Sequence, residues 1–233
     1  MTRAQLPPTG TEAAGLPPQA LERAALIVVD MNRAHLDQQI GHMLLAPETA
    51  AQVIAQAKQV LDAWRGAGLP VVFVRTHHRH NPETGEVIDN RNPFWMAQMK
   101  GHVPGLGQPR RTAAVEGAAV TEVMPELAPK PGESTVFKHR YSPFHNTDME
   151  LLLKNLGVDT LVVLGVNTNN CVLCTCFEGF NRDFGVYLVA DACGSMDGDD
   201  YHEAGLKLIA AALAWPVTTA DVVAAAEARR VPA

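Results

Sequence analysis

The sequence predicts a three-layer α/β/α fold with a mostly parallel central sheet of about six strands. Short runs of β-branched and other apolar residues alternate along the chain with segments of helical periodicity. Strands that alternate with helices in this way usually pair in parallel, with helices on both faces of the sheet. With 233 residues, of which 47% are hydrophobic, the chain has enough material for one large domain of this kind.

Two strands and a long helix are predicted in the first third of the chain. Residues 26–30 form a continuous apolar run that ends in a carboxylate, which is typical of a strand buried on both faces. Apolar residues then recur at helical spacing over residues 48–66, and a glycine at the end is suited to cap this helix. Residues 70–74 follow as the second strand.

A long segment, residues 75–132, has no clear periodicity and contains many of the prolines and glycines. Loops of this length inside a compact domain are usually functional and often cover a binding site. After it the alternation resumes. It predicts strands over 134–138, 160–164, 186–189 and 215–217, and helices over 148–155, 170–182, 201–213 and from about Asp221 onward, the last capped by Thr219.

The first twenty residues, the hydropathy and the charge of the chain limit its possible organisation and partners. Residues 1–20 contain two Pro-Pro pairs and no apolar core, so we expect an irregular arm there and a single domain over 21–233. No apolar run is long enough to cross a membrane. The formal net charge of -6, without a basic stripe, argues against nucleic acid as a partner. A cytoplasmic protein is the expectation.

Three of the four cysteines lie within six residues, at Cys171, Cys174 and Cys176, and the fourth is Cys193. Without a secretory signal we expect reduced thiols. The C-x-x-C spacing of Cys171 and Cys174 also fits a zinc site, but a closed site needs a second pair of ligands and no second C-x-x-C exists. Cys174, Cys176 and Cys193 are therefore interpreted as packing residues.

Three reactive side chains stand at predicted strand ends. Asp30 ends the first strand, Lys138 ends the third, and Cys171 lies in the turn after the fourth. Because parallel strands end at one edge of a sheet, these groups are expected to converge there. A helix N-terminus and a nearby cation lower a thiol pKa. Asp30 is placed to take the thiol proton and return it to a leaving amine, and the turn 165–170 to supply backbone N–H groups to an oxyanion.

Taken singly, each of these residues has a commoner structural role, and the functional hypothesis depends on their combination. The same combination, from residue 25 to about 223, resembles the isochorismatase-like cysteine hydrolases. The shared motifs are Asp30-Met31, Lys138 with Tyr141-Ser142-Pro143-Phe144 and Thr147-Asp148-Met149-Glu150, Gly165-Val166-Asn167-Thr168-Asn169-Asn170-Cys171-Val172, and later Thr175, Phe180, Asp191-Ala192 and His202.

The resemblance implies an Asp30–Lys138–Cys171 triad and a cis peptide between Val166 and Asn167. It also implies an oxyanion hole made by the backbone amides of Asn167 and Cys171. Members of that family hydrolyse small amides and ureido compounds, and they commonly form homodimers or homotetramers. No cofactor is expected for this chain. Candidate substrate contacts, on the loops expected around the site, are His35, Arg75, Trp95 and Tyr141.

Two departures from the family pattern concern the substrate. Residues 32–36 read Asn-Arg-Ala-His-Leu, where most members have Gln followed by Asp-Phe. Nicotinamide-hydrolysing members bind a metal through Asp-x-His after the second strand, and Thr76 stands in place of that Asp. The nearby histidines, His77, His78 and His80, are interpreted as loop residues or substrate contacts, so no metal is expected.

Two alternatives stay open. One is isochorismatase-type hydrolysis of a vinyl ether, for which Cys171 is incidental and its replacement by alanine leaves activity largely intact. The other is a non-catalytic binding protein on the same fold, because fold does not determine function. Loss of a triad member is the feature that favours the binding protein, and all three members are present.

Overall fold

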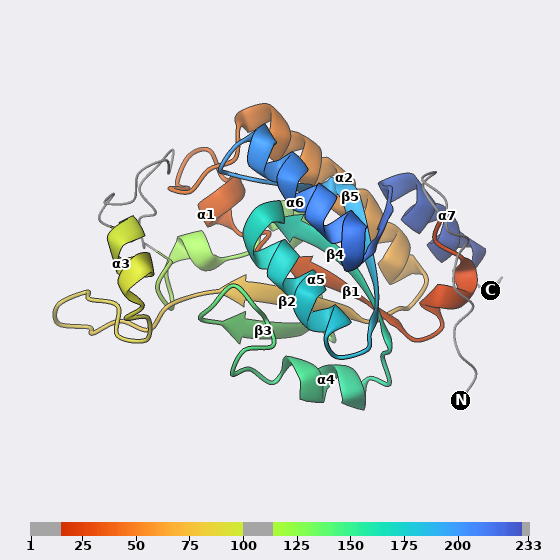
Figure 1. Cartoon of the computed structure of the whole chain (residues 1–233), viewed down its shortest axis with the longest axis horizontal. Helices are drawn as coiled ribbons and strands as arrows, with labels where there is room; N and C mark the ends of the chain where they lie inside the picture. Colours follow the sequence, from red (N-terminus) through yellow and green to blue (C-terminus); the bar gives the residue numbers. More distant parts are fainter. Residues whose placement is uncertain (1–14, 100–113, 230–233) are drawn as a thin grey trace.

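The central sheet of the computed structural model, which describes residues 15–99 and 114–229, has six strands that are all parallel (Figure 1). Their spatial order is β3-β2-β1-β4-β5-β6. The strands are β1 (Ala24–Val29), β2 (Val71–Thr76), β3 (Ser134–Lys138), β4 (Thr160–Val166), β5 (Gly185–Gly194) and β6 (Trp215–Val217). The predicted α/β fold class is therefore confirmed.

Helices cover both faces of this sheet (Figure 1). Alternate residues of each strand point to opposite faces, so Leu26 and Val28 of β1 join one core cluster and Ile27 and Val29 the other. The first cluster is covered by α2 (Pro47–Gly66) and α7 (Thr219–Ala228), and the second by α4 (Met149–Asn155), α5 (Leu173–Phe180) and α6 (Asp199–Ala212). All six residues of β1 are buried, which agrees with its apolar sequence.

Most element ends differ from the sequence-based expectation by a few residues, and two of the differences have a clear physical cause. The N-cap of α7 is Thr218, not Thr219: the Thr218 side chain accepts from the Asp221 amide, and the Asp221 side chain accepts from the Thr218 backbone. Strand β5 also runs five residues beyond the predicted end at residue 189. After a register shift it pairs again with β4, with Cys193 opposite Gly165. A bulge of this kind interrupts the regular alternation on which the prediction relied.

Short elements gather beyond the carboxyl ends of the strands. They are α1 (Arg33–Leu36), α3 (Pro93–Met99) and the 3-10 turn η2 (Ala119–Thr121). A second 3-10 turn, η3 (Pro125–Leu127), packs against α2, and a third, η1 (Pro18–Leu21), precedes β1. In Figure 1, α3 stands apart from the sheet on the side to which the arrows of β2 and β3 point. Residues 100–113 of the long segment, and residues 1–14 of the predicted arm, lie outside the described residues.

No helix within the described ranges is both long enough and apolar enough to span a membrane. The four cysteines are all free thiols, and Cys176 and Cys193 are buried among apolar residues of the second core cluster. Their packing role agrees with the interpretation drawn from the sequence. Only Cys171 among the four also faces a large cavity.

Gly165 permits the close approach of β1 and β4, the strands that precede Asp30 and Cys171. Its φ is +127°, and a Cβ added to it would lie 2.1 Å from the carbonyl oxygen of Val29. We expect Gly165→Ala to lower the free energy of unfolding by about 2–3 kcal/mol, because the two backbones must separate. Urea unfolding measures the change.

Gly185→Ala is the matched control, since its added Cβ meets the nearest atom at 3.4 Å and its φ is not in the positive range. It should unfold within about 1 kcal/mol of the wild type. Equal stability of the two variants would contradict the close contact.

Candidate active site

The three reactive residues meet at the point where the order of the sheet reverses. Chain order runs outward from β1 through β2 to β3 on one side and from β4 through β5 to β6 on the other. Asp30 directly follows β1, Cys171 follows β4, and Lys138 is the last residue of β3. Crevices at such reversals are where open parallel sheets bind ligands.

Lys138 connects the other two side chains. Its Nζ lies 2.8 Å from Asp30 Oδ2 and 3.2 Å from Cys171 Sγ. Asp30 and Lys138 are both 0% exposed, and Cys171 is buried as well. The convergence expected from the strand ends is thus present, within hydrogen-bonding distance and shielded from solvent.

Thr76, the last residue of β2, fixes the ion pair from the strand between. Its backbone N–H donates to Asp30 Oδ1 at 2.8 Å, and its hydroxyl accepts a short hydrogen bond from Lys138 Nζ. The register supports this arrangement, because Thr76 pairs directly with Lys138. Asp30 itself has a φ of +47°, which turns the chain at the end of β1. The sequence pattern around Thr76 indicated only the absence of a metal-binding Asp and did not predict this role.

The electrostatics differ from the expectation for the thiol. Burial raises the pKa of Cys171 to about 12, the charge of Lys138 counteracts this in part, and the negative charge of Asp30, together with its hydrogen bond to the thiol, raises the pKa again. The prediction of a lowered thiol pKa is therefore wrong. The sequence could not show how completely the site is removed from water, and desolvation disfavours the charged form of a thiol.

Asp30 and Lys138 are ionised. Burial alone would raise the pKa of Asp30, but the charge and hydrogen bond of Lys138 hold it below its usual value. Burial alone would lower the pKa of Lys138, and the charges of Asp30 and Cys171 hold it above its usual value. The resting site therefore contains a carboxylate, an ammonium and a protonated thiol.

The turn before Cys171 contains the cis peptide between Val166 and Asn167 that the family resemblance implies. A π-helical turn, η4 (Thr168–Val172), then leads into α5, so that Cys171 lies just before the α-helix begins. The Asn167 side chain accepts from the Met196 amide at 2.8 Å, and Thr175 donates to the Cys171 carbonyl at 2.6 Å. These bonds fix the backbone on either side of the thiol.

A cavity of about 700 Å³ opens onto the thiol. Three of the four predicted substrate contacts line it, namely His35, Trp95 and Tyr141. The fourth does not: Arg75 donates to the carbonyl of Thr121 and stacks over Phe137, beside a separate hollow. The cause is the alternation of side chains along β2, which turns Thr76 toward the cavity and Arg75 away from it.

Other residues of the cavity wall were not found from the sequence. They are polar side chains on loops without periodicity, and they include Asn32, Asn90, His139, Arg140 and Glu178. One signal was available: His139 directly follows Lys138, so the rule that strand ends carry sites also applies to it. For Asn90 and Arg140 no pattern in the sequence indicates a place at the site.

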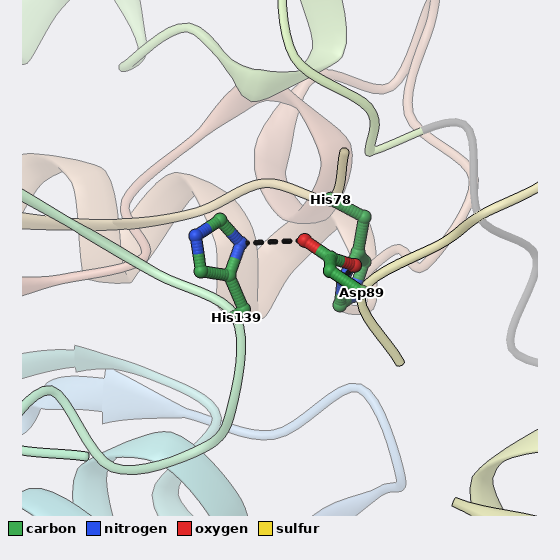
Figure 2. A group of neighbouring side chains, drawn as sticks. All are labelled: His78, Asp89 and His139. Carbon is green, nitrogen blue, oxygen red and sulfur yellow. Dashed lines mark hydrogen bonds and ion pairs between the residues drawn. The ribbon is translucent and has the colours of Figure 1, made fainter. Parts of the chain in front are cut away.

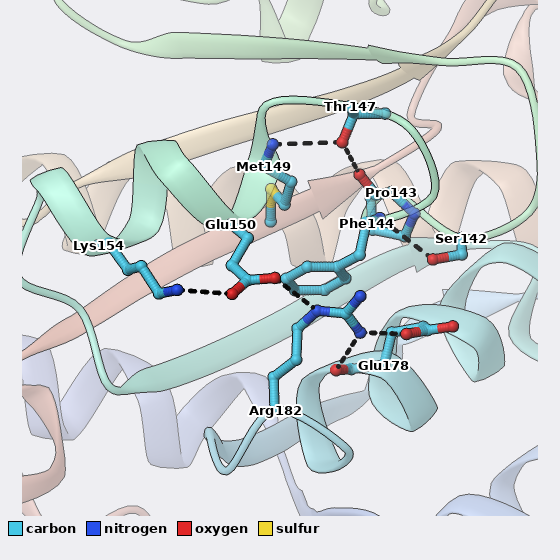
Figure 3. A network of polar contacts seen from close by, with 9 residues as sticks. All are labelled: Ser142, Pro143, Phe144, Thr147, Met149, Glu150, Lys154, Glu178 and Arg182. Carbon is cyan, nitrogen blue, oxygen red and sulfur yellow. Dashed lines mark hydrogen bonds and ion pairs between the residues drawn. The ribbon is translucent and has the colours of Figure 1, made fainter.

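The loop after β3, which contributes Tyr141 and Ser142 to the wall, is fixed from below by Arg182 of the turn after α5 (Figure 3). The Arg182 guanidinium lies 4.7 Å from the centre of the Phe144 ring and binds Glu150 at 3.0 Å and Glu178 at shorter range. Phe144 in turn donates its backbone N–H to Ser142 at 3.1 Å. The network joins α4, α5 and the wall loop into one unit.

The histidines after β2 separate in space. His77 stacks on Phe137 at 4.5 Å, whereas His78 is buried and lines the cavity. His78 lies beside Asp89 and His139 (Figure 2), and burial lowers the pKa of its imidazole. His80 belongs to neither arrangement and pairs with Val87 through its backbone.

Comparison with known proteins gives consistent matches. A family model described as the isochorismatase domain matches residues 24–221. The ureidoacrylate amidohydrolase RutB of Pantoea ananatis is 31% identical over 214 residues, which make up 89% of this chain and 79% of that protein. A solved cysteine hydrolase from Pseudomonas syringae pv. phaseolicola superimposes with a TM-score of 0.73 at 26% identity, over 98% of this chain and 100% of that chain.

The N-carbamoylsarcosine amidase of Thermoplasma acidophilum is also similar, with a TM-score of 0.62 at 24% identity, over 84% of this chain and 96% of that chain. At that identity the likeness supports the fold alone.

Removing the ammonium should destabilise the protein strongly. In Lys138→Met the Asp30 carboxylate loses its counter-charge in a buried site, so the free energy of unfolding should fall by about 3–5 kcal/mol. In the double variant Asp30→Asn/Lys138→Met no charge is left unpaired, and most of the loss should be recovered. Urea unfolding of both proteins measures this. A single variant as stable as the double would mean that Asp30 is not ionised.

The raised thiol pKa predicts the pH dependence of alkylation. Because only the thiolate reacts and the pKa of Cys171 is about 12, its reaction with iodoacetamide should accelerate steadily from about pH 6 to about pH 10. Mass spectrometry of the modified peptide gives the rate at Cys171 apart from that at Cys174. A plateau below about pH 8 would instead indicate a thiolate stabilised in the resting protein.

Proposed function

Because the chain belongs to the isochorismatase family, we propose that it is a cysteine amidohydrolase that cleaves a carbon–nitrogen bond of a small amide or ureido compound. Cys171 is the nucleophile in this proposal, Asp30 the proton acceptor and Lys138 their shared counter-charge. The names of the ureidoacrylate amidohydrolase relatives support this reaction class. We further expect a homodimer or homotetramer, as the family resemblance suggests, and the cytoplasmic location expected from the sequence stays a prediction.

One observation carries the proposal: a thiol, a carboxylate and an ammonium in direct contact at the base of a cavity. Lys138 Nζ lies 2.8 Å from Asp30 and 3.2 Å from the sulfur, and the thiol donates to Asp30. A buried ion pair is costly to the fold, and ionisable groups in such surroundings cluster at functional sites, so its position beside a thiol favours a catalytic role. The arrangement fits nucleophilic catalysis, in which a weak nucleophile is activated by an adjacent base.

The first half of the reaction forms a thioester. The Cys171 proton passes to Asp30 as the sulfur attacks the substrate carbonyl carbon, so the S–C bond forms while the carbonyl oxygen becomes negative. The backbone amides of Asn167 and Cys171 are the donors proposed for that oxygen. Collapse of the tetrahedral intermediate breaks the C–N bond, and Asp30 returns the proton to the departing nitrogen as ammonia or an amine.

The second half regenerates the thiol. A water molecule in the vacated position gives its proton to Asp30 and attacks the thioester carbonyl. The C–S bond then breaks, and the proton on Asp30 returns to the sulfur. Lys138 remains an ammonium throughout, because its pKa is held above its usual value.

His35 supports recognition of a substrate that carries N–H groups. Its Nδ1 lies 2.9 Å from the Met43 carbonyl, which can only accept, so Nδ1 carries the proton. Burial lowers the pKa of this imidazole, which is therefore neutral and leaves Nε2 as an acceptor. His35 lines the cavity together with Asp30. A primary amide or ureido group would provide the N–H donor that such an acceptor binds.

The first experiment measures ammonia release from a panel of nicotinamide, biuret, triuret, carbamoyl-sarcosine and ureidoacrylate-like compounds. The wild type should turn over at least one ureido or amide compound. In Cys171→Ala, kcat/KM should fall by about 10⁴-fold or more, because the covalent route is lost. Cys174→Ala is the matched control: Cys174 lies three residues further along the chain, in α5, and it does not line the cavity. It should stay within about threefold of the wild type.

Ammonia release that persists in Cys171→Ala would overturn the nucleophile assignment. Absence of turnover across the panel, together with no alkylation of Cys171 at high pH, would favour hydrolysis of a vinyl ether or a binding protein on this fold.

A further inference from the structure

A second cluster of ionisable side chains lies in the wall of the same cavity. His78 Nδ1 is 3.0 Å from Asp89 Oδ1, and His139 Nδ1 is 2.8 Å from Asp89 Oδ2. Figure 2 shows the His139 imidazole facing the Asp89 carboxylate, with His78 beside it. One nitrogen or oxygen from each residue lies within 4.8 Å of the other two. Three donor atoms therefore converge on a space that one ion could occupy.

The donor set is suited to a transition-metal ion. Two imidazoles and one carboxylate bind zinc in many catalytic sites, and they also suit iron, cobalt and nickel. Calcium and magnesium prefer sites made of oxygen ligands alone. A neutral imidazole can carry its proton on either nitrogen, so the protons now shared with Asp89 do not prevent ligation.

The rest of the protein holds the three ligands in place. Asp89 accepts a hydrogen bond from the Arg79 amide at 2.8 Å. His139 Nδ1 also lies 2.7 Å from the His77 carbonyl, and ligation through Nδ1 would move its proton to Nε2 and replace this hydrogen bond. His78 and Asp89 are both largely buried, with side chains 6% and 12% exposed. The ligands come from three segments: the end of β2, the loop before α3 and the end of β3. Such separate anchoring is typical of a built site more than of a chance surface cluster.

The cluster is open toward the cavity. His78 and His139 line that cavity together with Cys171, whereas Asp89 lies behind them and does not. An ion held by these three side chains would keep at least one coordination position on the side of the bound substrate. A position of this kind takes water or an electron-pair donor of the substrate, such as a carboxylate or carbonyl oxygen.

We propose that His78, Asp89 and His139 bind one divalent transition-metal ion, zinc first among the candidates, beside the Asp30–Lys138–Cys171 site. The proposal goes beyond carbon–nitrogen hydrolysis and does not depend on it, because it is tested by binding alone. No metal was expected from the sequence, because only the histidines close to β2 were weighed as ligands. The carboxylate and the second imidazole come from positions 11 and 61 residues after His78.

The test is titration of the metal-free full chain with Zn²⁺ against a chromophoric chelator, with Co²⁺ as a spectroscopic probe. The wild type should bind one equivalent of Zn²⁺ and give a Co²⁺ absorption band in the visible region, without a sulfur-to-cobalt charge-transfer band. Asp89→Asn keeps the shape of the side chain and removes its charge, and we expect it to bind Zn²⁺ about 100-fold more weakly. His139→Ala should lose at least as much affinity.

His145→Ala is the matched control, because His145 also lines the cavity but does not belong to the cluster. Its affinity should equal that of the wild type, and thermal unfolding of the metal-free variants verifies that each is folded. Equal Zn²⁺ affinity in the wild type and Asp89→Asn would overturn the proposal and leave the cluster as a hydrogen-bonded clamp. A sulfur-to-cobalt band would overturn it as well, since it would place the ion on a cysteine.

Discussion

The buried ion pair between Asp30 and Lys138 is the interaction on which the rest of the site depends. Two charges without solvent contact are tolerated only where each is compensated, and here each has a partner at 2.8 Å. Thr76 supplies the remaining bonds, through its amide to Asp30 and its hydroxyl to Lys138. These bonds require β1, β2 and β3 to end at the same level, so the pair fixes strand register as well as chemistry. A one-residue slip of β3 would turn Lys138 to the other face of the sheet.

The sheet topology explains why a cysteine more than a hundred residues away completes this group. The order reverses between β1 and β4, and Gly165 lets the two backbones approach closely there. The chain then turns through Val166 and Asn167 into η4, which places Cys171 over the carboxyl end of β1. Cys171 is positioned by backbone that hydrogen bonds fix on both sides, so its place does not depend on the loops of the cavity wall.

Sequence patterns were sufficient to predict the fold and the meeting of the three reactive residues, since both follow from the order of the strands and from where each strand ends. Strand ends in a parallel sheet share an edge, so Asp30, Lys138 and Cys171 could be expected to meet without knowledge of any loop. Properties that depend on solvent access could not be predicted in this way. The thiol pKa was expected to fall and instead rises to about 12, because burial outweighs the nearby ammonium. The place of Asp89 beside His78 and His139 could not be predicted, because it depends on the path of a loop without periodicity.

The raised thiol pKa follows from the charges of the resting site. With Asp30 ionised, Lys138 ionised and the thiol protonated, the buried group has no net charge. Moving the proton from Cys171 to Asp30 creates a thiolate and removes the carboxylate, and the net charge is still zero. Lys138 Nζ contacts both atoms that carry the negative charge in turn, at 2.8 Å and 3.2 Å. In the proposed mechanism the site therefore never holds an uncompensated charge away from water, which would cost several kcal/mol. A thiolate formed by loss of the proton to solvent would leave two anions beside one cation. Burial therefore disfavours loss of the thiol proton to solvent. It favours transfer of that proton from the Cys171 sulfur to Asp30, because this transfer leaves the net charge of the site unchanged.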